Sequence, residues 1–316
     1  MNKLYKQYPA FRKDSLQVSE IHKIYFEESG NPKGKPVILF HGGPGSKSKP
    51  RHRRIFNPKK WRVIMFDQRG CGKSKPFGEI HDNTTWDLLE DTEKLRKHLK
   101  INKWAVYGAS WGSTLAIAYA EKYPKVVSNL IVSSIWLCRK KDVDWLFNGE
   151  CLRRMFPDLW EWRTSALKKL GLSSGYNSKI LFNILKNGTE KEKKLVSAIF
   201  ENWEGQFYKV KQSIKLIKAE DSRIKDIESN KVLMHYVVNN CFFKDNQLVK
   251  EAKKLPKVPT VIIQGRYDVV CPLDNAWDLK NAVLHSKLEI IPGVGHHSSE
   301  RGTINKLIEY TDRYSN

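Results

Sequence analysis

The chain has 316 residues, 5 cysteines and a formal net charge of +22. This length exceeds that of a usual single core but suits an α/β core that carries an inserted subdomain. It contains no apolar run long enough for a membrane span and begins without the apolar stretch of a signal peptide, so we expect a soluble, cytoplasmic protein. The cysteines are odd in number and lack C-x-x-C spacing, which argues against a disulfide or zinc framework.

The positive charge could favour binding of a nucleic acid, an anionic membrane surface or an acidic substrate. Lysines are spread along the whole chain, however, with one local basic cluster between Lys47 and Lys60. No RNP or zinc-finger motif accompanies them. We therefore expect neither a nucleic-acid nor a membrane partner.

Short apolar runs alternate with helix-like segments along the chain. The runs suit strands buried on both faces of a parallel sheet, and they are Val37–Phe40, Val63–Phe66, Ala105–Tyr107, Leu130–Ser133, Val261–Ile263 and Leu288–Ile291. A capped helix start is predicted at residues 83–87, followed by Leu88, Thr92, Leu95 and Leu99 on one face.

The alternation breaks between residues 137 and 254, where tryptophans and lysine-rich helical stretches appear without a clear strand. We therefore predict an α/β-hydrolase fold with a doubly wound, mostly parallel sheet. Residues 1–136 and 255–316 would form the core, and residues 137–254 would form an inserted helical cap over the site.

Residues 108–112, Gly-Ala-Ser-Trp-Gly, match the pattern Gly-x-Ser-x-Gly between a strand-like and a helix-like run. In that setting the motif forms a nucleophile elbow, a strained turn that projects the hydroxyl of Ser110. Gly108 and Gly112 would leave the room that lets strand and helix close together. The bare pattern also occurs by chance, so its weight depends on partners elsewhere in the chain.

A strand-like run also leads into residues 41–45, His-Gly-Gly-Pro-Gly. Such a turn can be an ordinary tight turn or a phosphate-binding loop, but it lacks the ending of a P-loop and the spacing of a dinucleotide site. In hydrolases with a nucleophile elbow, this loop and the residue after the nucleophile offer backbone N–H groups to the oxyanion. We predict Gly43 and Trp111 as these donors.

Two later strand-like runs lead to Asp268 and to His296. The order Ser110, Asp268, His296 is the nucleophile, acid, base order of α/β hydrolases. We predict that His296 is the general base and that Asp268 orients its ring. Neighbouring His297 competes for the role of base, but Gly295 before His296 and Glu300 four residues after it favour His296.

Longer segments are more specific: Phe-Asp-Gln-Arg-Gly-Cys-Gly-Lys-Ser at 66–74, Asn-Thr-Thr-Trp-Asp-Leu at 83–88, Trp-Glu-Gly at 203–205 and Gly-Arg-Tyr-Asp at 265–268. Together with the motifs above, they resemble the proline iminopeptidase (prolyl aminopeptidase) family of the α/β-hydrolase superfamily over most of the chain. The resemblance implies release of N-terminal proline from peptides, with no metal or organic cofactor. It also implies the roles given above for Ser110, Asp268 and His296.

The resemblance further implies a substrate site. Glu204 would pair with the substrate's cationic amine, although without the resemblance it is typical of a surface carboxylate. Trp136, Phe147 and Cys271 would line an apolar pocket for the proline ring, positions that core packing explains equally well. Leu233 stands where the family usually has a second glutamate, which weakens selection for the charged amine. The alternative function is therefore a relaxed hydrolase of small esters or amides.

Overall fold

The protein is described by a computed structural model that covers residues 4–149, 152–172, 176–210 and 216–315, without the side chains of Leu152 and Glu204. The strands are β1 (Ala10–Gln17), β2 (Lys23–Gly30), β3 (Lys35–Phe40), β4 (Trp61–Phe66), β5 (Trp104–Ser110), β6 (Val127–Ile135), β7 (Thr260–Gly265) and β8 (Lys287–Ile291). The core helices are α1 (Thr85–His98), α2 (Trp111–Lys122), α10 (Leu273–Ala282) and α11 (Arg301–Arg313).

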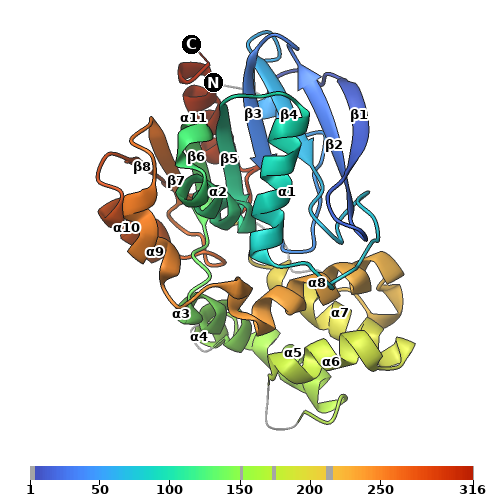
Figure 1. The fold of residues 1–316 in the computed structure, drawn as a ribbon. Coiled ribbons are helices and arrows are strands. Elements are labelled where there is room, and N and C mark those ends of the chain that lie inside the picture. Colours follow the sequence, from blue (N-terminus) through green and yellow to red (C-terminus); the bar gives the residue numbers. More distant parts are fainter. Residues whose placement is uncertain (1–3, 150–151, 173–175, 211–215, 316) are drawn as a thin grey trace.

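The strands form one sheet in the order β1-β2-β4-β3-β5-β6-β7-β8. From β4 to β8 all neighbours are parallel, while β1 and β2 pair antiparallel at one edge. Helices α1 and α2 lie on one face of the sheet and α11 lies on the other (Figure 1). The predicted doubly wound α/β-hydrolase fold is confirmed.

Alternate residues of the parallel strands enter two separate hydrophobic cores. In β3, Ile38 and Phe40 pack with the cluster under α1 and α2, whereas Val37 and Leu39 pack with the cluster under α11. All four side chains are at most 1% exposed. Burial on both faces explains why these strands appear in the sequence as continuous apolar runs.

Helix α1 begins where its sequence predicts. The side chain of Thr84 accepts a hydrogen bond from the Asp87 amide (3.2 Å), and the Asp87 carboxylate accepts one from the Thr84 amide (2.8 Å). This capping box satisfies two backbone donors that the helix leaves unpaired. The predicted apolar face, residues 88, 92, 95 and 99, is buried.

The antiparallel pair of β1 and β2 is absent from the sequence-based prediction. Strand β2 buries two carboxylates, Glu27 and Glu28, which give it the polarity of a surface segment. Arg53 lies 3.1 Å from Glu27, and Arg62 lies 2.5 Å from Glu28. Buried charges are tolerated only when they are paired, and these partners come from other parts of the chain.

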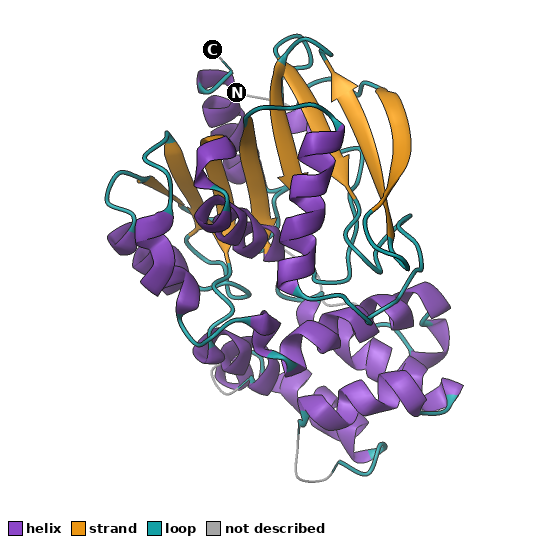
Figure 2. Cartoon of the chain, in the orientation of Figure 1, coloured by secondary structure: helices purple, strands orange, loops and turns teal. Residues whose placement is uncertain are grey.

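Helices fill the segment between β6 and β7, and no strand occurs there among the residues that the structure describes. They are α3 (Lys140–Val143), α4 (Leu152–Met155), α5 (Pro157–Lys168), α6 (Ser178–Asn187), α7 (Glu190–Glu204), α8 (Ile224–Val238) and α9 (Gln247–Glu251). Helices α5 to α8 form a layer beyond the carboxyl ends of the parallel strands (Figure 2). The domain boundaries at 137 and 254 stay predictions. Within the described ranges, no helix combines the length and apolar character needed to cross a bilayer.

Glu121 near the end of α2 provides a pH-dependent test of the core. It is 8% exposed, and burial together with the charge of Glu251 raises the pKa of its carboxyl to about 9. The folded protein therefore holds a proton that the unfolded chain releases above its ordinary pKa of 4.5, so stability from this group falls as pH rises through that interval.

Replacement of this carboxyl by a neutral amide removes the proton linkage. Glu121→Gln should raise the free energy of unfolding by about 1–3 kcal/mol at pH 8 and by much less at pH 5. Urea denaturation at the two pH values checks this. An equal gain at both would contradict the assignment of a protonated Glu121.

Candidate active site

Ser110 occupies the sharp turn between β5 and α2, with φ of 57° and ψ of −131°. This backbone conformation is strained for a residue with a side chain and persists because its surroundings impose it. A Cβ added to Gly108 would lie 1.9 Å from the Gly112 carbonyl oxygen, and one on Gly112 would lie 2.3 Å from the Phe40 carbonyl oxygen. Both glycines are therefore required by close backbone approach, as the motif predicts.

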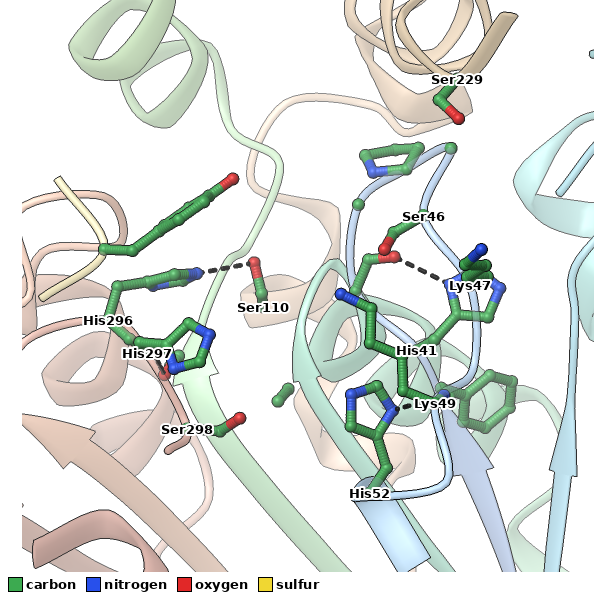
Figure 3. A pocket seen from close by; sticks show the side chains of 18 of the residues that line it. His41, Ser46, Lys47, Lys49, His52, Ser110, Ser229, His296, His297 and Ser298 are labelled. Carbon is green, nitrogen blue, oxygen red and sulfur yellow. Dashed lines mark hydrogen bonds between the residues drawn. The ribbon is translucent and has the colours of Figure 1, made fainter. Parts of the chain in front are cut away.

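The structure brings Ser110, His296 and Asp268 into one hydrogen-bonded row, although 186 and 28 residues separate the bonded pairs. Ser110 Oγ lies 3.1 Å from His296 Nε2, and His296 Nδ1 lies 2.9 Å from Asp268 Oδ2. Because the carboxylate only accepts, Nδ1 carries the proton and Nε2 is left to accept from the serine hydroxyl. Figure 3 shows His296 directed at Ser110.

Besides His296, three further groups donate hydrogen bonds to the carboxylate of Asp268. Its Oδ1 accepts from the amides of Val270 (3.0 Å) and Cys271 (2.8 Å), and its Oδ2 accepts from Gln264 Nε2 (3.1 Å). Gln264 also accepts from the Ile135 amide (2.8 Å), so it ties β6 to the acid. Sequence reasoning missed Gln264, and the signal was a polar residue inside the apolar run of β7.

The His-Gly-Gly-Pro-Gly turn is joined to the elbow through Gln68, a second residue that sequence reasoning missed. Gln68 donates from its amide nitrogen to the His41 carbonyl (3.0 Å) and accepts from Trp111 Nε1 (2.9 Å). Its backbone N–H donates to His41 Nε2 (3.1 Å), which leaves Nδ1 to donate to the Gly42 carbonyl (2.8 Å). Burial lowers the pKa of His41, in keeping with this neutral ring.

The two predicted oxyanion donors lie on the two segments that Gln68 joins. Trp111 is the first residue of α2, where backbone N–H groups have no partner within the helix. Gly43 follows Gly42, whose added Cβ would lie 3.6 Å from Ser110 Cβ. Gly43 has φ of +122°, a conformation that favours glycine. Backbone amides close to a serine hydroxyl can stabilise negative charge that develops on a bound carbonyl oxygen, and this role for Gly43 and Trp111 stays a prediction.

A cavity of about 780 Å³ opens above Ser110. The predicted substrate residues Trp136, Phe147, Cys271 and Leu233 all line it, and each is at most 6% exposed. They come from four places: the residue directly after β6, a π-helical turn at residues 144–148, the loop after β7, and α8. Glu204 ends α7, and its side chain lies outside the described part of the structure.

His297, the alternative base in the sequence, lines the same cavity, but its ring nitrogens contact residues other than the serine. Its Nδ1 lies 2.5 Å from Ser299 Oγ and its Nε2 lies 3.3 Å from Arg51 Nη2. Burial and the nearby Arg51 lower the pKa of His297 to about 4. Glu300 accepts from the Gly295 amide (2.8 Å) and so helps to hold the loop that carries His296.

Tyr208, after α7, is a further site residue that sequence reasoning missed. Its ring stacks on His296, with ring centres 5.6 Å apart, and its carbonyl accepts from the His297 amide (2.6 Å). The segment that follows α7 therefore covers one face of the His296 ring. No local pattern around residue 208 signals this contact, which depends on how the cap sits on the core.

The bridge formed by Gln68 predicts a specific defect. Gln68→Leu preserves side-chain volume but leaves the His41 carbonyl and Trp111 Nε1 without their partner. We expect kcat for an arylamide or ester to fall about 10- to 100-fold with little change in KM, since the lost alignment matters most in the transition state.

Steady-state kinetics of the purified variant, with unfolding by urea as the folding control, tests this effect. A loss of stability of about 1–3 kcal/mol is expected as well, because buried polar groups lose partners. If kcat in the folded protein stayed at the wild-type value, Gln68 would be a purely structural residue.

The sequence comparisons agree with this geometry. The chain matches the α/β-hydrolase fold family over residues 35–303. It is 40% identical to a probable proline iminopeptidase of Leptolyngbya boryana, over 99% of this chain and 97% of that protein. It is 37% identical to the proline iminopeptidase of Xylella fastidiosa (strain Temecula1), over 99% and 100%. It is 38% identical to that of Arabidopsis thaliana, over 96% and 80%.

Solved structures are similar in fold. VinJ has a TM-score of 0.67 at 19% identity, over 97% of this chain and 99% of that one. A probable hydrolytic enzyme of Pseudomonas aeruginosa has a TM-score of 0.64 at 17% identity, over 98% and 95%. The full-length relatives and the fold together place the chain in the proline iminopeptidase family of α/β hydrolases.

Proposed function

We propose that the protein is a serine aminopeptidase that releases N-terminal proline from peptides. The observation that carries this proposal is the hydrogen-bonded row of Ser110, His296 and Asp268 at a strained elbow, in a chain whose full-length relatives are named proline iminopeptidases. The row supplies a nucleophile, a base and an orienting carboxylate in the order that acyl transfer requires.

In the first step, Ser110 Oγ attacks the carbonyl carbon of the N-terminal proline while His296 Nε2 takes the hydroxyl proton. Asp268 keeps its hydrogen bond to Nδ1–H and stabilises the imidazolium that forms. The carbonyl oxygen becomes an oxyanion, which the N–H groups of Gly43 and Trp111 stabilise. These interactions are strongest when the charge is fully developed, so they lower the barrier more than they strengthen substrate binding.

In the second step, the peptide C–N bond breaks and His296 gives its proton to the departing nitrogen. Proline is left as an ester of Ser110. A water then attacks this ester while His296 takes one of its protons, and the proton returns to Ser110 Oγ as free proline leaves. At the end of the cycle, Ser110 and His296 are back in their starting protonation states.

Selectivity for proline would come from the walls of the cavity. Trp136, Phe147 and Cys271 offer apolar surface that suits a pyrrolidine ring. Glu204 would accept the cationic amine from the end of α7. Leu233 lines the same cavity without a charge, so a single carboxylate would carry amine recognition where the family usually has two.

The cysteines support a proposal for the compartment. Cys71, Cys138 and Cys241 are buried free thiols, Cys271 is buried as well, and Cys151 lies outside the described residues. Reduced thiols suit a reducing compartment, and we include the cytoplasm in the proposal on that ground.

The nucleophile assignment has a direct test. Ser110→Ala should reduce turnover of proline arylamide by at least about 1,000-fold, because only the attacking oxygen is lost. The melting temperature should stay close to the wild-type value. A fluorophosphonate probe should label the wild-type protein and leave the variant unlabelled. More than a few per cent of residual turnover would rule out Ser110 as the nucleophile.

The amine role of Glu204 can be separated from a structural role. Glu204→Gln should lower kcat/KM for proline arylamide by an amount equivalent to about 1.5–3 kcal/mol of transition-state stabilisation, the scale of a charge-assisted hydrogen bond. Hydrolysis of an ester without an amine should barely change. Glu201→Gln, nearly one turn earlier on α7, is the matched control. Equal losses on both substrates would show that Glu204 supports the fold, and preference for the ester would favour the relaxed hydrolase.

A further inference from the structure

One wall of the active-site cavity is crowded with cations. Lys47, Lys49 and Arg51 follow the His-Gly-Gly-Pro-Gly turn and line the cavity. Figure 3 shows Lys49 extending toward the middle of the cavity, on the side of Ser110 away from His296. Among the described lining residues, six are lysine or arginine, whereas Asp226 is the only carboxylate and is bound by Arg223.

These three cations differ from the other basic residues of the same cluster. Arg53, two positions on, is buried against Glu27, and Arg54 donates to the Tyr5 carbonyl (2.7 Å). In contrast, no described carboxylate pairs with Lys47, Lys49 or Arg51. Partial burial and the charges of Arg51 and Lys47 lower the pKa of Lys49, as expected where cations crowd without a counter-ion.

The backbone beneath the cations is anchored. The Ser48 amide donates to Asp67 Oδ1 (2.8 Å), and Ser48 Oγ donates to the Phe66 carbonyl (2.8 Å). The His52 amide donates to the Lys49 carbonyl (2.9 Å). The backbone of this wall is therefore fixed by hydrogen bonds, and the wall carries an unbalanced positive charge.

The chemistry of the reaction determines which end of a peptide meets this wall. His296 must protonate the departing nitrogen, so the residue after proline lies beside it. Arg51 contacts His297, the neighbour of His296, from the basic wall. Arg51 is therefore the end of the wall nearest the departing peptide, and Lys49 lies farther along it, across Ser110 from His296. The cationic amine of the substrate is repelled by the same wall. The departing peptide, and not the amine, is the part that meets this wall.

We propose that Lys49 and Arg51, supported by Lys47, form a carboxylate subsite for the departing peptide. This inference rests on the proposed aminopeptidase function. Each residue after the scissile bond moves a terminal carboxylate about 3.5 Å farther from Ser110, so only short peptides bring that group to the wall. The enzyme would favour short substrates with a free C-terminus, or substrates with an acidic side chain close after proline.

The test compares kcat/KM for Pro-Gly-Gly and Pro-Gly-Gly amide by measuring released proline. The wild-type enzyme should favour the free acid about three- to tenfold at low ionic strength, the scale of two partly exposed ion pairs, and less in 0.5 M NaCl. Lys49→Gln/Arg51→Gln should bring the ratio close to one. Lys59→Gln, an exposed lysine of the same basic cluster outside the cavity, is the charge-matched control and should keep the wild-type ratio.

A second pair of substrates separates the two sources of carboxylate. Pro-Glu-Gly amide against Pro-Gln-Gly amide reports an acidic side chain, and a preference in either pair that the double variant loses supports the subsite. Ratios near one in both pairs, with proline released, would overturn the subsite and leave the aminopeptidase function intact. If none of the four peptides released proline, the proposed function itself would be overturned.

Discussion

The close approach of β3, β5 and α2 is the constraint on which the site depends. The turn can carry Ser110 in a strained conformation only because Gly108 and Gly112 let three backbones meet without side chains between them. The same contact directs the serine hydroxyl out of the sheet and places the first amide of α2 beside it. The proposed nucleophile and one proposed oxyanion donor are thus two results of one packing arrangement.

Buried amide side chains extend this rigid centre to the neighbouring loops. Gln68 joins the elbow to the glycine-rich turn, and Gln264 joins β6 to Asp268. An amide can donate and accept at once and needs no counter-ion, so it links two loops in a buried site at a lower desolvation cost than a charged group. Alignment of Ser110, His296 and Asp268 then rests partly on two side chains, Gln68 and Gln264, that are not among the residues lining the cavity.

Charge has separate roles in different parts of this basic protein. Inside the fold, Arg53 and Arg62 neutralise carboxylates that an edge strand buries. Around the cavity, cations are left unbalanced on the wall that continues the glycine-rich turn. A peptide with an amine at one end and a carboxylate at the other would be oriented by this asymmetry, since the field favours one direction of entry.

Local pattern was enough to predict the parallel strands, the start of α1, the elbow and the three residues Ser110, Asp268 and His296. Each of these follows from hydrophobic period, turn chemistry or chain order, which neighbouring residues express directly. Only the tertiary structure decided the edge strands, the links through Gln68 and Gln264, and the stacking of Tyr208 on His296. It also decided that Arg51 lines the cavity while Arg53 is buried against Glu27. These depend on partners far away in the chain, and a residue's own neighbours carry no information about which distant group will pair with it once the chain is packed.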